Sequence, residues 1–230
     1  MINLIKKSDN ILVICAHPDD ETLGLGGMIA LHAKKGGNVF VLIFATGQFA
    51  RDESEKGIGI RRKQGEKACS MLGVKEVQFL GYDDQKLDTM STTTLINEIE
   101  KAIKKWKPKI VFTHYWEDAN QDHRKVFEAT LIACRPTPSS TIDQIICYET
   151  PSSTEWGSVN HRYSPNMFVD ISSVINKKIE ALQKYKDEMN KYPHPRSIES
   201  ITNRAKYWGS SVGIDYAEAF VNLRTIIRQV

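Results

Sequence analysis

The chain has 230 residues, of which 41% are hydrophobic and 26% are charged, and its formal net charge is +3. This composition is typical of a globular protein with a buried core, and the net charge is too small to indicate a nucleic-acid-binding surface on its own. No apolar run approaches the ~20 residues that span a bilayer, and the run after Lys7 is too short for a signal-peptide core. We therefore expect a cytoplasmic protein without nucleic-acid partners or membrane insertion.

The four cysteines support a reducing compartment. They are Cys15, Cys69, Cys134 and Cys147, and no two of them form a Cys-x-x-Cys pair. Each lies in or beside an apolar run, which is typical of a buried, reduced thiol.

Short apolar runs rich in β-branched residues alternate with helix-like segments along the first two thirds of the chain. The predicted strands are Ile11–Ala16, Asn38–Phe44, Glu76–Leu80, Lys109–Thr113 and Gln144–Tyr148. The predicted helices between them are Gly26–Lys35, Ile60–Leu72, Thr92–Trp106 and Asp122–Arg135. Nearly continuous apolar runs are typical of parallel strands covered on both faces. The alternation predicts a Rossmann-like, doubly wound α/β fold with a mainly parallel sheet flanked by helices.

The C-terminal end is predicted to add further strands and helices. We expect a strand near Met167–Ile171, helices near Ser173–Lys191 and Ile198–Gly209, and a last helix from about Tyr216. No linker-like composition and no internal repeat divides the chain, so residues 1–230 are expected to form a single domain. The polar stretch Thr150–Asn166 is long for a loop in a compact domain, which is typical of functional loops.

Polar clusters follow four of the predicted strands. They are His17–Glu21, Thr46–Gln48, Asp83–Asp84 and His114–His123. In open α/β sheets, ligands bind beyond the carboxyl ends of the strands, so these clusters are expected to meet at one site.

The cluster after the first strand carries a metal-binding pattern. His17 and Asp20 are three residues apart at the end of a strand, and His123 is expected to open a helix across the sheet. Two histidines, one carboxylate and an open fourth position describe a catalytic zinc site, although such a set also accepts iron or cobalt. Zinc would lower the pKa of a bound water to roughly 7, and Asp19 would serve as general base.

Simpler interpretations exist for each of these residues. A single histidine after a strand is most often a core or surface residue, and Asp20 or Glu21 would also suit a helix cap. Asp122 is interpreted as a residue that orients a ligand histidine or as an N-terminal cap. His114 is a candidate for lining the pocket and His194 for reaching the substrate. His17, Asp19 and Asp20 follow the end of one predicted strand, and Asp122 and His123 follow the end of another. This coincidence favours the metal site over the simpler interpretations.

The motif residues resemble a known family. The segment Ala16–Glu21, followed by Gly24, Gly26 and Gly27, resembles the first signature of the LmbE-like (PIG-L) deacetylases, and Asp122–Arg124 matches the second. The resemblance implies a Rossmann-like fold and zinc-dependent removal of acetyl groups from N-acetylglucosamine-type sugars or sugar conjugates, with release of acetate and a free amine. It implies one zinc ion per chain, and it leaves a homo-oligomer open.

By position, the resemblance gives roles to individual residues. His17, Asp20 and His123 correspond to the zinc ligands and Asp19 to the general base, the same roles that spacing indicates. An arginine in the helix after the second strand contacts substrate in the family, and Arg61 fits best, with Arg62 as the alternative.

Asn120 departs from the family pattern. Many members carry histidine at this position. Because asparagine cannot deliver a proton at neutral pH, we assign Asn120 to oxyanion or substrate contact.

Three other functions remain open at this point. Gly24, Gly26 and Gly27 follow a strand as a nucleotide-binding turn would, although the carboxylates before them would repel phosphate. The chain would also suit a non-catalytic sugar-binding module. The same hydrolysis on a different acyl amide, such as an aminosugar of thiol biosynthesis, is the third alternative.

Overall fold

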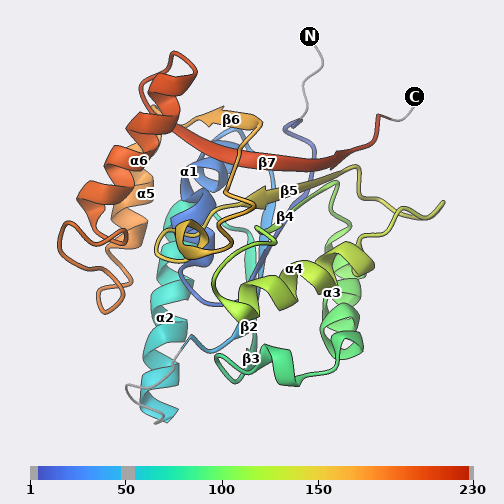
Figure 1. The fold of residues 1–230 in the computed structure, drawn as a ribbon. Helices are drawn as coiled ribbons and strands as arrows, with labels where there is room; N and C mark the ends of the chain where they lie inside the picture. The colour runs from blue at the N-terminus through green and yellow to red at the C-terminus, as the bar shows by residue number, and fades with distance from the viewer. Residues whose placement is uncertain (1–4, 48–54, 228–230) are drawn as a thin grey trace.

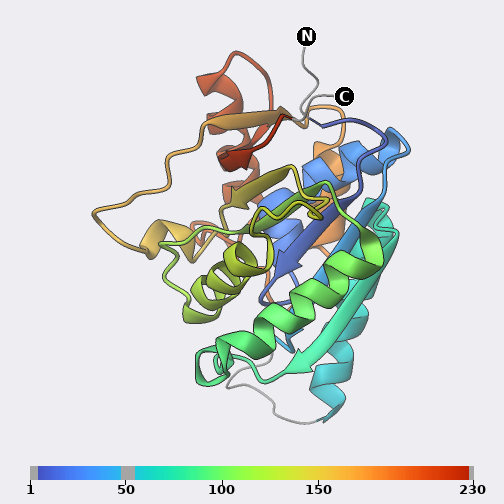
Figure 2. The ribbon, with the colours of Figure 1, turned by 90° about the vertical axis from the view of Figure 1, so that its right-hand side faces the viewer.

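The computed structural model describes residues 5–47 and 55–227, and all statements below concern these residues. They form a seven-stranded sheet covered by helices on both faces, as Figures 1 and 2 show. The strands are β1 (Ile11–Cys15), β2 (Val39–Ala45), β3 (Glu76–Tyr82), β4 (Ile110–His114), β5 (Gln144–Tyr148), β6 (Met167–Asp170) and β7 (Ala217–Thr225). The helices are α1 (Asp20–Lys34), α2 (Glu55–Leu72), α3 (Thr92–Trp106), α4 (Gln121–Ala133), α5 (Ile175–Leu182) and α6 (Ile198–Ser211), with single 3₁₀ turns η1 (Leu87–Thr89) and η2 (Thr154–Trp156).

The strand order is β3-β2-β1-β4-β5-β7-β6. Strands β1 to β5 run parallel, and β7 lies antiparallel between β5 and β6. From β1, the chain first adds strands on one side of the sheet and then, with β4, on the other side. The position between β1 and β4 is therefore the switch point, where doubly wound sheets bind ligands. The predicted Rossmann-like, mainly parallel fold is confirmed.

The alternation of side chains along the strands creates two hydrophobic cores. Val13 and Val41 belong to a cluster with residues of α1, α2 and α5, whereas Leu12 and Leu42 belong to a cluster with residues of α3 and α4. All four side chains are completely buried. Burial on both faces explains why these strands are apolar at nearly every position. In the described part of the chain, no helix combines the length and apolarity needed to cross a membrane.

The C-terminal predictions need two corrections. The prediction of a last helix from Tyr216 is wrong, because Ala217–Thr225 form strand β7. Pairing with β5 and β6 on both sides outweighs the helix preference of Ala217 and Glu218. The helix expected over Ser173–Lys191 is shorter: α5 ends at Leu182 and a series of turns follows. These turns bring Tyr185 into the core, where its hydroxyl donates to Glu21.

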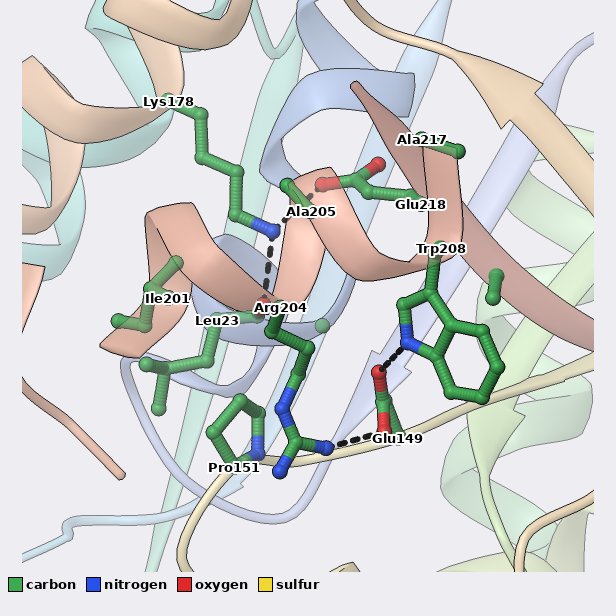
Figure 3. Close-up of a pocket in the computed structure, with 12 residues that line it drawn as sticks. Leu23, Glu149, Pro151, Lys178, Ile201, Arg204, Ala205, Trp208, Ala217 and Glu218 are labelled. Carbon is green, nitrogen blue, oxygen red and sulfur yellow. Dashed lines mark hydrogen bonds and ion pairs between the residues drawn. The ribbon is translucent and has the colours of Figure 1, made fainter. Parts of the chain in front are cut away.

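Helix α1 is broken at Leu25, and a buried ion pair fills the break. Leu25 has non-helical dihedral angles, so the normal i to i−4 hydrogen bonds around it are lost. The Glu218 carboxylate accepts from the N–H groups of Gly27 at 2.8 Å and Met28 at 2.7 Å. The Lys178 ammonium donates to the Leu23 carbonyl at 2.9 Å and to Glu218 at 2.6 Å, as Figure 3 shows. The pair therefore supplies the partners that the broken helix lacks.

Two glycines allow α1 to pack closely against the rest of the fold. A Cβ at Gly24 would lie 2.4 Å from the Tyr148 ring, and one at Gly27 would lie 2.7 Å from Ile171. Neither neighbour can move far, because Tyr148 and Ile171 are fully buried. Close packing accounts for both glycines and holds the first turn of α1 beside β5.

Replacing Lys178 by methionine is expected to lower the free energy of unfolding by about 3–5 kcal/mol, because it leaves the Glu218 carboxylate buried without its cation. Urea denaturation of the purified variant measures the change. Lys177→Met, at the exposed neighbouring position, is the matched control and should stay within about 0.5 kcal/mol of the parent. Equal stability of the two variants would contradict a supporting role for the ion pair.

Candidate metal centre

Two chain segments meet at the switch point of the sheet. One is the turn from β1 into α1, which carries His17, Asp19 and Asp20, and the other leads from β4 to the start of α4 with His123. The turn is fixed by the Asp20 side chain, whose Oδ2 accepts from the backbone N–H of His17 at 2.8 Å. The ring of His114 holds the strand end, because its Nε2 accepts from the N–H of Ala16 at 2.9 Å.

Three predicted ligands converge on one point. His17 Nδ1 lies 3.2 Å from His123 Nε2 and 3.6 Å from Asp20 Oδ2, and His123 Nε2 lies 3.5 Å from Asp20 Oδ1. Zinc bound tetrahedrally at about 2.0–2.2 Å places neighbouring ligand atoms roughly 3.3–3.6 Å apart. Asp20 Oδ1 is buried and has no hydrogen-bond donor among the described residues, so a cation would supply its missing partner. These residues fit a single divalent metal ion.

On the side away from the candidate metal position, each candidate histidine ligand has carboxylate neighbours. The outer nitrogen of His17, Nε2, lies 2.8 Å from Asp84 Oδ1 and 3.1 Å from Asp122 Oδ2. The outer nitrogen of His123, Nδ1, lies 3.1 Å from Asp118 Oδ1. Carboxylates in this position fix the tautomer and orientation of a ligand histidine and raise its basicity.

Hydrogen bonds hold the supporting carboxylates in turn. Asp122 accepts from the backbone N–H groups of Gln85 at 2.8 Å and Leu87 at 3.1 Å. Asp118 accepts from the hydroxyls of Ser153 and Thr154, which belong to the long polar loop after β5. The loop therefore contributes to the site from behind a ligand.

The surroundings of Asp20 and Asp118 hold these two carboxylates in their charged form. Burial raises the pKa of Asp20, but the nearby His123 and His114 lower it well below its usual range. Burial also opposes ionisation of Asp118, yet His123 and the two hydroxyls bring its pKa down to about 2. Burial lowers the pKa of His17, whereas Asp122, Asp20 and Asp84 raise it well above the usual value. This concentration of buried negative charge favours a cation at the centre.

Asp19 lies beside the ligands in a strained conformation. Its φ is 114°, in the region that favours glycine, and such strain costs about 1–3 kcal/mol and persists where the surroundings hold it. Its Oδ2 accepts from Arg61 Nη2 at 2.9 Å and from Arg196 Nη1 at 2.9 Å. Its backbone N–H donates to Glu21, and burial raises the pKa of that glutamate to about 7 although Thr22 and other neighbours donate to it.

Three other predicted site residues, Arg61, Asn120 and His194, lie in the segments around the candidate ligands. Arg61 is buried against Asp19 and the carbonyl of Pro18. Asn120 is the N-cap of α4, where its Oδ1 accepts from the N–H of Asp122 at 2.9 Å. His194 accepts from the N–H of Arg196 at 3.0 Å, a bond within the loop whose Arg196 side chain contacts Asp19.

His114 is completely buried behind the candidate ligands. Its ring stacks on His123 with centroids 3.9 Å apart, and its Nδ1 faces the Thr150 hydroxyl. Burial, followed by the electrostatic interaction with His123, lowers the pKa of His114 to about 4, so its ring is neutral near pH 7. The His114 ring has no exposed surface and packs behind the candidate ligands. This placement does not favour the prediction that His114 lines a substrate pocket.

Sequence reasoning assigned no role to Asp84, Asp118 or Arg196. Asp84 and Asp118 lie in the polar clusters that follow β3 and β4. Their position at the carboxyl ends of strands could therefore have indicated a role in the site. Arg196 lies in a loop far from every motif, and no local pattern marks it.

Comparison with known proteins assigns the chain to a family. The profile of the GlcNAc-PI de-N-acetylase (PIG-L) family matches residues 12–134. The uncharacterized deacetylase YaiS of Escherichia coli K12 is 32% identical over 192 residues, which cover 81% of this chain and 95% of YaiS. The chain belongs to the PIG-L family. This family member is a hydrolase of the de-N-acetylase type, and the candidate metal ligands described above lie within the matched segment.

Two further relatives extend the similarity over the C-terminal part of this PIG-L family member. Diacetylchitobiose deacetylase of Thermococcus kodakarensis is 30% identical over 233 residues, which cover 94% of this chain and 82% of that protein. The structure of N,N'-diacetylchitobiose deacetylase from Pyrococcus horikoshii has a TM-score of 0.77 at 24% identity and covers 97% of this chain and 86% of that one. At this identity, the structural similarity establishes the fold.

Proposed function

We propose that this PIG-L family member is a zinc-dependent hydrolase that removes an N-acetyl group from an N-acetylated amino sugar or sugar conjugate. The observation that carries the proposal is the convergence of His17 Nδ1, His123 Nε2 and the Asp20 carboxylate at ligand spacing, with Asp19 beside them. Such a site would leave a coordination position open beside a carboxylate that is not itself a ligand, as hydrolytic zinc sites do.

His17, Asp20 and His123 would hold the metal. When bound, zinc would polarise the amide carbonyl and lower the pKa of water to roughly 7. Asp84, Asp122 and Asp118 keep the two ligand histidines oriented.

The proposed reaction is hydrolysis of an amide. Water attacks the carbonyl carbon while Asp19 accepts one of its protons, and the bond between the carbonyl carbon and the nitrogen then breaks. The amine leaves with a proton that Asp19 returns, so the products are acetate and a free amino sugar. Asn120, at the start of α4, is proposed to donate a hydrogen bond from its amide nitrogen to the oxyanion or the substrate. Arg61 is proposed to contact substrate from α2.

The substrate class follows from the relatives. One relative deacetylates diacetylchitobiose, another is a probable N-acetyl-α-D-glucosaminyl L-malate deacetylase of Bacillus cereus, and a third acts on an inositol-linked 2-acetamido sugar. Their substrates share a 2-acetamido glucose unit, which we propose for this chain. The whole chain is proposed to act as one domain, supported by the single sheet and by the insertion of Glu218 into α1. A cytoplasmic location is proposed from the four buried free thiols.

Chelation is expected to abolish acetate release, and added zinc is expected to restore it. The protein is assayed with diacetylchitobiose, N-acetylglucosaminyl malate and N-acetylglucosaminyl inositol before and after treatment with a chelator, and bound metal is measured by elemental analysis. Restoration by zinc, with one ion per chain, supports the proposal. Full activity in metal-free protein would refute it, and activity restored by iron or cobalt but not by zinc would correct the choice of metal.

A further inference from the structure

Two arginines from distant parts of the chain hold one oxygen of Asp19. Arg61, in α2, and Arg196, in the loop before α6, each donate to Oδ2 over 2.9 Å. The contact between Arg196 and Asp19 spans 177 positions of sequence. The Arg196 side chain is 19% exposed and that of Asp19 is 3% exposed, so solvent screens the contact only weakly.

The Arg196 guanidinium is fixed by further contacts. Its Nε donates to the Ser152 hydroxyl at 2.6 Å, and its Nη1 lies 3.2 Å from a Glu188 oxygen. The other oxygen of Glu188 lies 3.0 Å from Arg61 Nη1, so the two arginines share both carboxylates. The backbone N–H of Arg196 donates to His194, which orders the turn that presents the side chain. A planar guanidinium held at several points restricts the carboxylate that it contacts.

These contacts leave the two Asp19 oxygens in different environments. Oδ2 accepts from both guanidinium groups, whereas no contact found among the described residues occupies Oδ1. The strained backbone of Asp19 needs surroundings that hold it, and the two arginines supply contacts of that kind.

We infer that Arg196 is a positioning residue for Asp19. Together with Arg61 it holds Oδ2, so that Oδ1 is the oxygen that accepts the proton of the attacking water. This inference rests on the proposed hydrolytic function. Arg196 lies outside residues 12–134, so the role belongs to the C-terminal part of the chain rather than to the family motifs.

Steady-state kinetics of Arg196→Ala, Arg196→Lys and Arg224→Ala test the inference. Arg196→Ala is expected to lower kcat about 100-fold with KM changed less than about 3-fold, because misplaced reacting groups slow the chemical step. Arg196→Lys, which restores the cation, should recover part of kcat, as should guanidinium ions added to the alanine variant. Arg224→Ala removes a half-buried arginine of β7 that donates to the Cys134 carbonyl, and should retain kcat.

Other results would overturn the inference. A raised KM with unchanged kcat in Arg196→Ala would place Arg196 in substrate binding, and unchanged values of both would leave it no part in turnover. A double-mutant cycle of Arg196→Ala and Asp19→Ala, in which each single variant removes the contact, tests it by melting temperature without activity. Additive changes in melting temperature would overturn the inference. If the parent protein releases no acetate, the proposed function fails, whereas the cycle still reports on the contact.

Discussion

Asp19→Asn is expected to lose nearly all turnover while retaining bound metal. The substitution removes the proton acceptor, and general acid–base catalysis typically contributes about 10²–10⁴-fold in rate. Asparagine keeps a side-chain oxygen that can accept from Arg61 and Arg196, so the surrounding contacts and the fold should persist. Acetate release and elemental analysis of zinc, measured on the same preparation, separate the loss of turnover from a loss of metal.

A nearby aspartate provides the control for this variant. Asp83 is exposed in the loop after β3 and pairs with Lys86, so Asp83→Asn should leave turnover unchanged. Full activity of Asp19→Asn would refute the assignment of the general base. A variant that loses zinc together with turnover would instead show that Asp19 helps to hold the metal.

His123→Ala is expected to weaken zinc binding by more than about 100-fold, since loss of a partner behind a ligand already costs about 10–100-fold. The substitution removes Nε2 from the cluster and leaves Asp118 without its histidine partner. Competition with a chromogenic chelator measures the affinity. Because the ring also packs on His114, His123→Gln is a second variant that fills the space while changing the ligand.

His161→Ala is the matched control for the loss of a histidine. The His161 side chain is 65% exposed in the loop between β5 and β6, so its removal should leave zinc affinity unchanged. Zinc content in His123→Ala equal to that of the parent would exclude His123 as a ligand.

The sequence predicted β1, β2, β4 and β5 well because their burial on both faces makes them apolar at nearly every position. Strand β3 lies at the edge of the sheet and is only partly buried. Strand β7 escaped prediction because Ala217 and Glu218 favour helix locally, whereas the strand exists through its pairing with β5 and β6. The early end of α5 was missed for a similar reason, because contacts of Tyr185 with distant residues decide where the helix stops.

The convergence of the candidate ligands could be predicted because the sheet brings their two chain segments together. His17 and His123 follow neighbouring parallel strands, and the rule that carboxyl ends of strands carry ligands places them at one edge. The surroundings of Asp19 could not be predicted in this way. The contact of Arg196 depends on how two irregular loops pack, and the turn chemistry around His194 does not reveal that packing.

The ion pair within α1 bears on how the nascent chain matures. Asp20 lies one turn before a break whose N–H groups are satisfied by Glu218, a residue of the last strand in the fold. While residues 12–134 alone have emerged from the ribosome, every proposed metal ligand is present, yet α1 still lacks the carboxylate and the ammonium that complete it. Domains generally fold as units during synthesis, so we expect the proposed metal site to be completed only after β7 has been made.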